Sequence, residues 1–166
     1  MKAFAALAAL LAVATANPVA TEPRNATQVE LDKRDTEIVY LLNCKNVIAC
    51  CPPLAETDSS RIAYYSASGS ANGGNPPSGN NVCTVSGNSY TTWESNSPGC
   101  TFPTNVRFVT HIDADAQSRP NYSWAGWGTN GFKNFNCYKD NGHQLYRTDA
   151  TESSTSCNSI YYCVPQ

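Results

Sequence analysis

The chain has 166 residues and a formal net charge of −2, and 14% of its residues are charged. Residues 35–166 carry seven Lys or Arg and ten Asp or Glu, which gives a net charge of −3 without any run of basic residues. This balance argues against binding to nucleic acid or anionic lipid, because such binding depends on clustered positive charge. The length fits a single folded domain.

The first 16 residues have the pattern of a secretion signal. Lys2 is followed by an apolar run from Ala3 to Val13, which is shorter than the roughly 20 residues that a membrane span needs. Ala14-Thr15-Ala16 is the small-x-small pattern that signal peptidase recognises, with cleavage after Ala16. The alternative, a buried or membrane helix, is disfavoured because no basic stop-transfer flank follows. We therefore expect a secreted, extracellular protein with no membrane span.

Residues 17–34 are polar, contain no cysteine and end in the pair Lys33-Arg34. A segment of this composition cannot bury a core of its own, and kexin-type proteases cleave after such dibasic pairs. The alternative is an ordinary pair of surface charges. The sequence predicts a pro-segment that is removed after Arg34, and a mature domain of residues 35–166. This layout resembles the precursors of small secreted, cysteine-rich fungal proteins, including effectors and toxins.

All eight cysteines follow the predicted processing site: Cys44, Cys50, Cys51, Cys83, Cys100, Cys137, Cys157 and Cys163. An even number of cysteines in a small secreted domain predicts four disulfides, for which 105 pairings are possible. Cys50 and Cys51 are adjacent, so we expect them to bond two different partners. A zinc site is the alternative, but the chain has no CxxC pair and both histidines lie far from any cysteine cluster. We expect neither a metal nor a cofactor.

The mature domain lacks long helical periodicity. It consists of short runs rich in β-branched and aromatic residues, separated by Gly, Asn, Ser and Pro clusters. This pattern predicts a single all-β domain, a disulfide-stapled antiparallel sandwich or barrel. The predicted strands are residues 37–43, 61–66, 81–86, 89–93, 105–112, 122–127, 132–138, 144–147 and 159–164.

Several segments carry more specific signals. In residues 105–112 the even-numbered positions from Val106 to Ile112 form one face of the predicted strand, and the odd-numbered positions, including Arg107 and His111, form the other. Asp140-Asn141-Gly142 predicts a hairpin turn between two strands. Residues 60–66 have a helix as an alternative. Residues 67–80 are rich in Gly, Asn, Ser and Pro, which predicts an irregular segment that is either a binding loop or slack.

Asn121-Tyr122-Ser123 is a glycosylation sequon within the predicted mature domain. Use of this sequon requires Asn121 to lie on a solvent-facing loop. Whether it carries a glycan is left open by the sequence.

Residues 121–141 are the most aromatic part of the chain and include Trp124, Trp127, Phe132, Phe135 and Tyr138. Residues three apart lie on opposite faces of a strand, so these rings form one platform only if the intervening glycines break the strand. Exposed rings would stack on sugars or insert into a partner, whereas buried rings would fill a core that is poor in Leu and Ile. We expect the set to be mainly core, with one of Trp124 and Trp127 exposed. Tyr90 is a third candidate for sugar binding.

His111 and His143 are the only histidines and therefore the candidates for proton transfer at near-neutral pH. In its size, acidity, disulfides and richness in Tyr, Asn, Ser and Gly, the chain is similar to the guanyl-specific fungal ribonucleases. That similarity implies a carboxylate base, an imidazole acid and a phosphate-binding arginine, roles for which Glu94, His143 and Arg107 are the candidates, with His111 as a second imidazole. The family pattern has a histidine before its catalytic glutamate, and none precedes Glu94. We therefore expect a non-enzymatic protein.

Tyr161-Tyr162-Cys163 resembles the Tyr-x-Cys motif of ribonuclease-like fungal effectors, although that motif stands near the mature N-terminus in those proteins. With the precursor layout, this resemblance implies a monomeric effector-like or toxin-like protein that acts outside the cell on an unidentified host or cell-wall component. A carbohydrate- or cell-wall-binding module that uses Trp124, Trp127 and Tyr90 is the second hypothesis. A small secreted ribonuclease-like hydrolase is the third.

Overall fold

The computed structural model describes residues 37–49, 54–72 and 74–166. The predicted cleavage sites after Ala16 and after Lys33-Arg34 lie outside the described residues, as do Cys50 and Cys51. The signal and the pro-segment therefore stay predictions.

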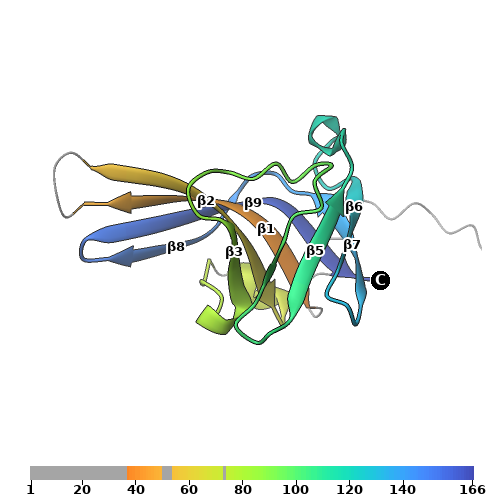
Figure 1. Cartoon of the computed structure of the whole chain (residues 1–166), viewed down its shortest axis with the longest axis horizontal. Coiled ribbons are helices and arrows are strands. Elements are labelled where there is room, and N and C mark those ends of the chain that lie inside the picture. The colour runs from red at the N-terminus through yellow and green to blue at the C-terminus, as the bar shows by residue number, and fades with distance from the viewer. Residues whose placement is uncertain (1–36, 50–53, 73) are drawn as a thin grey trace, which may run out of the picture.

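Nine antiparallel strands form one sheet in the described part of the chain (Figure 1). In the sheet the strands follow the order β3-β2-β1-β9-β7-β6-β5-β4, and β8 also pairs with β9. Within the described residues, helical structure is limited to α2 (Ser68–Asn72) and two 3₁₀ turns, Gly79–Asn81 and Ala116–Ser118. The prediction of an all-β antiparallel domain is confirmed. The strands are β1 (Ile38–Ile48), β2 (Ala55–Tyr65), β3 (Val82–Ser86), β4 (Gly99–Thr101), β5 (Arg107–Ile112), β6 (Trp124–Thr129), β7 (Asn134–Lys139), β8 (Gln144–Ala150) and β9 (Ser153–Pro165).

The sheet curls into a nearly closed barrel, and a disulfide joins the two strands at its ends. Cys83 of β3 bonds Cys100 of β4, with their Cα atoms 5.9 Å apart. Bringing the end strands together shields backbone groups that an open sheet would leave unpaired. Of the two predicted architectures, the chain therefore adopts the barrel.

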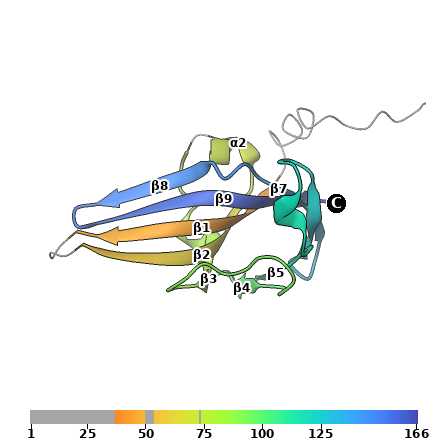
Figure 2. The same cartoon turned by 90° about the horizontal axis from the view of Figure 1, so that it is seen from above.

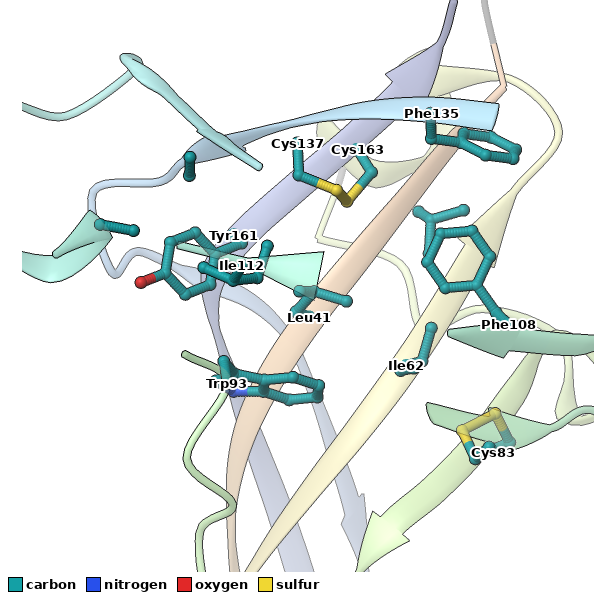
Figure 3. Close-up of a cluster of buried hydrophobic side chains, with 14 of the residues drawn as sticks. Leu41, Ile62, Cys83, Trp93, Phe108, Ile112, Phe135, Cys137, Tyr161 and Cys163 are labelled. Atoms are coloured by element: carbon teal, nitrogen blue, oxygen red, sulfur yellow. A yellow bond between two sulfur atoms is a disulfide. The ribbon is translucent and has the colours of Figure 1, made fainter. Parts of the chain in front are cut away.

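The barrel interior holds one cluster of apolar side chains (Figure 3). Leu41 of β1, Phe108 of β5 and Phe135 of β7 are at most 1% exposed, and the Phe108 and Phe135 rings meet edge to face with centroids 5.2 Å apart. The predicted alternation along β5 is confirmed, because Phe108, Thr110 and Ile112 are buried and the intervening residues are not.

β1 is also buried on its outer face. Tyr40 and Leu42 belong to a second cluster, to which Leu145 and Tyr146 of β8 also contribute. The predicted irregular segment 67–80 adds to this cover, because it contains the packed turn α2, whose Ala71 is 3% exposed. The expectation of an irregular segment was therefore wrong at α2. β2 includes residues 60–65, so the strand predicted over residues 61–66 is confirmed except at Ser66, and the helix alternative was wrong.

Two more disulfides bond residues that face each other on neighbouring strands. Cys44 of β1 pairs with Cys157 of β9, and Cys137 of β7 pairs with Cys163 of β9. Three of the four predicted disulfides are therefore present. The six described cysteines bond one another, so none of them is the separate partner expected for Cys50 or Cys51.

Beyond the barrel, parts of β1, β2, β8 and β9 continue as a four-stranded sheet in the order β2-β1-β9-β8 (Figure 2). We call this region the extension, and it comprises residues 43–48, 55–60, 144–150 and 153–158. The Cys44–Cys157 disulfide crosses its base. β9 is 13 residues long, so its first half pairs with β8 and its second half with β7.

Residues 89–93 are not the predicted strand. They belong to an irregular segment between β3 and β4 that closes one end of the barrel. Trp93, 2% exposed, donates from Nε1 to Asn43 Oδ1 at 3.2 Å, and the Thr91 amide donates to Ser60 Oγ at 2.9 Å. The aromatic residues of this run make it resemble a strand, but its tryptophan packs in the barrel core.

Asp140-Asn141-Gly142 is not a hairpin turn, because β7 and β8 do not pair with each other. The segment instead connects β7, which pairs with the second half of β9, to β8, which pairs with the first half. Asp140 is 3% exposed and accepts a hydrogen bond from Ser159 Oγ at 2.6 Å. The Asn-Gly pair therefore provides a connection along β9, in which Gly142 adopts a φ of 76°.

Candidate functional site

The four residues considered for catalysis do not share a hydrogen bond or an ion pair in the described chain. Glu94 pairs with Ile112, next to His111, but its carboxylate accepts hydrogen bonds from the buried Tyr161 hydroxyl and from Gln117. The His111 ring lies on the outer face of β5, where its Nδ1 is 2.8 Å from Ser97 Oγ.

The other two candidates lie elsewhere. His143 is in the connection between β7 and β8, with Nδ1 2.7 Å from Asn141 Oδ1. Arg107 is exposed at the start of β5, at the opposite end of that strand from Ile112. None of these contacts joins one of the four side chains to another.

The structure does bring Trp124 and Trp127 together on the outer surface of β6. Gly126 has a φ of 149°, and the pairing of β6 with β7 shifts register between Trp124 and Gly126. This bulge changes the alternation of side chains, so both tryptophans point outward, 46% and 40% exposed, while Ala125 is fully buried. Glycine is required at 126, because a Cβ there would lie 2.2 Å from the His111 carbonyl oxygen.

The expectation that this aromatic set is mainly core was therefore wrong. Phe135 is buried and Tyr138 is half-buried, but both tryptophans are exposed rather than one, and Phe132 in the β6–β7 turn is 85% exposed. The sequence analysis required a glycine to break the strand before these rings could lie on one face, and the bulge at Gly126 is such a break for Trp124 and Trp127.

Neighbouring side chains hold the two indole rings in place. The His111 ring stacks on Trp127 with centroids 3.9 Å apart and planes at 21°. The Arg119 guanidinium lies 5.9 Å from the centre of the Trp124 ring and donates from Nη1 to the Trp124 carbonyl at 3.0 Å. Asp113 and Asp115 both accept hydrogen bonds from Arg119, which holds the pKa of Asp115 below its usual range.

We call the surface of Trp124, Trp127, His111 and Asn136 the tryptophan face. Asn136 of β7 is the cross-strand partner of Trp127, and its Oδ1 accepts a hydrogen bond from Gln166 Nε2 at 3.2 Å. The face therefore combines two rigid aromatic rings with neighbouring amide and imidazole groups.

Tyr90 is not part of this face. It lies in the segment between β3 and β4, is 44% exposed, and its hydroxyl is hydrogen-bonded to Asp58 of β2. Burial of the hydroxyl and this bond raise the pKa of Tyr90. Tyr90 borders a groove on the extension, which is also lined by Asn43, Lys45, Ser156, Asn158 and Ile160.

The sequence analysis identified Tyr90 but missed the rest of the groove. A signal was present in β1, where the inward positions Val39 and Leu41 are followed at the same spacing by Asn43 and Lys45. Such a change from apolar to polar on one face of a strand indicates that the face leaves the core.

Asn121 of the sequon is exposed in the turn before β6. The residue is therefore accessible for glycosylation, as the sequon requires. Ser123 of the same sequon donates from Oγ to the Pro120 carbonyl at 2.6 Å.

Within residues 37–49, 54–72 and 74–166, no group of three His, Cys, Asp or Glu side chains is arranged to hold a metal ion. The helices of the same residues are all too short and too polar to cross a bilayer. No protein-family model, curated protein or solved structure matches the chain. Its function is therefore inferred from its own surfaces.

Proposed function

We propose that this is a non-enzymatic extracellular protein that binds carbohydrate through the tryptophan face. The three disulfides fit a small cysteine-rich protein that works in an oxidising environment outside the cell. Among the described residues no hydrogen bond or ion pair joins His111, His143, Glu94 and Arg107 to one another, and this favours binding over catalysis.

The exposure of both Trp124 and Trp127 on one outer face carries this proposal. A sugar ring has apolar C–H faces that stack on an aromatic ring, and equatorial hydroxyls that need hydrogen-bond partners at the edge. The indoles supply the stacking surfaces, and Asn136 stands beside Trp127 as a source of hydrogen bonds. Two large rings exposed on the same outer face form the kind of apolar patch that marks a binding surface, whereas a single exposed ring such as Phe132 does not.

The rings are also held in position before any ligand arrives. His111 supports Trp127, and Arg119, fixed by Asp113, supports Trp124. A surface whose side chains are already ordered loses less conformational entropy on binding. This arrangement suits a flat, extended polysaccharide such as a cell-wall glycan.

An effector-like or toxin-like role in contact with a host rests on the layout of the precursor and stays a prediction. The glycan proposal is compatible with it, because a host or fungal cell wall would present the ligand. Incubation with RNA at two pH values should leave the RNA intact, whereas cleavage that is lost in His111→Ala or His143→Ala would show a hydrolase instead.

The proposal is tested by retention of the secreted protein on insoluble cellulose, chitin and cell-wall glucan. We expect wild type to be retained on at least one of them and the Trp124→Ala/Trp127→Ala double variant to bind about 30-fold more weakly, which corresponds to about 2 kcal/mol for central aromatic residues.

Phe132→Ala is the matched control, because it removes an aromatic ring that is more exposed than either tryptophan but lies in the β6–β7 turn. It should be retained like wild type. Equal retention of wild type and the double variant would contradict the proposal, and equal loss in Phe132→Ala would show unspecific aromatic adhesion.

A further inference from the structure

The inner face of the extension forms a groove that the tryptophan face does not use. Inside the barrel the inward residues of β1 are apolar, but beyond Trp93 this face continues with Asn43 and Lys45. The segment between β3 and β4 passes over this side of the strands (Figure 1) and is tied to them by the Thr91–Ser60 and Trp93–Asn43 hydrogen bonds. A hollow remains between the segment and the sheet.

This groove has a volume of about 430 Å³, which lies within the range of small-molecule sites. Tyr90 forms one wall, and its hydroxyl lies close enough to the Asp58 carboxylate for a hydrogen bond. The opposite side is formed by Ser156 and Asn158 of β9. The groove thus offers one exposed aromatic ring across from polar side chains.

The charges of the groove are already balanced. Lys45, its one lining cation, pairs with Glu56 of β2 at 2.9 Å. The nearby carboxylate of Asp58 is engaged by the Tyr90 hydroxyl. A phosphate or carboxylate ligand would therefore have to compete with Glu56 for Lys45, which disfavours anionic ligands.

The remaining polar groups can both donate and accept hydrogen bonds. Asn43 Oδ1 accepts from Ser60 Oγ at 2.8 Å and from Trp93 Nε1 at 3.2 Å, which leaves its NH₂ group as the donor. Among the described contacts, the Asn158 side chain makes no hydrogen bond, although its residue is exposed beside the groove. The two neutral amides, Asn43 and Asn158, match a ligand whose hydroxyl groups also both donate and accept hydrogen bonds.

We propose that the groove binds a neutral, polyhydroxylated ring, such as one residue of a soluble oligosaccharide, stacked on Tyr90 and hydrogen-bonded by Asn43 and Asn158. This site is separate from the tryptophan face and is a concave groove, whereas the tryptophan face is the outer surface of a strand. It suits the end of a short chain, whereas the face suits the side of a long polymer.

The test is titration of isotope-labelled protein with neutral tetrasaccharides of glucose, N-acetylglucosamine and mannose, followed by NMR and calorimetry. At least one of them should shift the side-chain amide signals of Asn43 and Asn158. It should also shift the Trp93 indole N–H, because that group donates to Asn43. Tyr90→Ala and Asn158→Ala should each weaken binding about tenfold.

Two variants serve as controls. Tyr90→Phe keeps the stacking ring and should retain most of the affinity. Thr148 is exposed like Asn158 but lies on the opposite face of the extension, so Thr148→Ala should bind like wild type.

The groove proposal is overturned if none of the three sugars shifts the Asn43 and Asn158 signals, or if sulfated or acidic sugars bind more tightly than neutral ones. Shifts confined to Trp124 and Trp127 would also overturn it and would leave the proposed function standing. If sugars bind the groove but the double tryptophan variant is retained on polysaccharide like wild type, the groove proposal stands. In that case only the proposal that the tryptophan face binds carbohydrate is contradicted.

Discussion

The barrel and the extension are built from the same strands, β1, β2 and β9, but they are stabilised in different ways. In the barrel the inner face carries Leu41, Phe108 and other side chains that are at most 1% exposed. In the extension the same face carries Lys45 and Asn158, which are exposed to solvent, and buried residues such as Cys44 occur only near its base. Burial of apolar side chains therefore stabilises the barrel, whereas backbone pairing between strands and the Cys44–Cys157 disulfide stabilise the extension. The extension is therefore free to carry polar recognition groups.

Truncation of one inward side chain in each region should show the largest difference between the barrel and the extension. Phe108→Ala in the barrel should lower the free energy of unfolding by about 3–5 kcal/mol, because it leaves a cavity beside Phe135. Val47→Ala at an inward, half-buried position of the extension should cost less than about 1 kcal/mol. Urea denaturation measures both values, and equal losses would contradict the division.

Removal of the closing disulfide should come next in size. The Cys83→Ala/Cys100→Ala variant frees a loop with a sequence separation of 17, which corresponds to about 3 kcal/mol in the chain-entropy treatment. Amide hydrogen exchange should accelerate in β3 and β4 and stay unchanged in β8. Acceleration in β8 as well would show that the extension depends on barrel closure.

A smaller effect is expected at the bulge that exposes the tryptophans. Gly126→Ala should cost about 2–3 kcal/mol, because its Cβ would meet the His111 carbonyl at 2.2 Å and its φ is 149°. Gly142→Ala is the control, since its φ of 76° is also positive but nothing lies within 4 Å of the added Cβ, and it should cost about 1 kcal/mol. Denaturation midpoints of the two variants give the comparison, and equal costs would remove the steric argument.

The smallest expected effect is on the pH dependence of stability at the barrel end opposite the extension. Burial, with the hydrogen bond from the Tyr64 hydroxyl to Glu37 at 2.8 Å, raises the pKa of Tyr64 from 10.0 to about 12. Because the folded pKa is the higher one, this tyrosine stabilises the fold fully below pH 10 and loses that contribution as the pH rises toward 12. Between pH 10 and pH 12 the free energy of unfolding should therefore fall less in Tyr64→Phe than in wild type, as measured by urea denaturation at each pH. An equal fall in the two proteins would show that Tyr64 does not cause this pH dependence.

The sequence predicted those parts of the fold in which apolar residues alternate or cluster. β5 was predicted from the alternation ending in Phe108, Thr110 and Ile112, and β3 from a short apolar run. β1 and β2 were predicted too short, because residues such as Lys45 and Thr57 are polar and exposed. A strand without an apolar face gives no periodic signal.

The candidate site was only partly predictable, for a different reason. Trp124 and Trp127 were identified, but their common exposure depends on the φ of Gly126, and residue spacing alone does not encode that angle. Tyr90 was grouped with them by chemistry, although the closure of the barrel places it beside Asp58 and Asn43 instead. Such proximity arises from strand order, and the sequence does not display strand order.

The central claim, that carbohydrate binds the tryptophan face, is tested most directly by the indole N–H signals of the three tryptophans. During titration with a soluble fragment of whichever polysaccharide retains the protein, the Trp124 and Trp127 signals should shift together and saturate. Trp93, which contacts the groove residue Asn43, reports separately on that site. Saturable binding of the fragment without any shift of Trp124 and Trp127 would contradict the account.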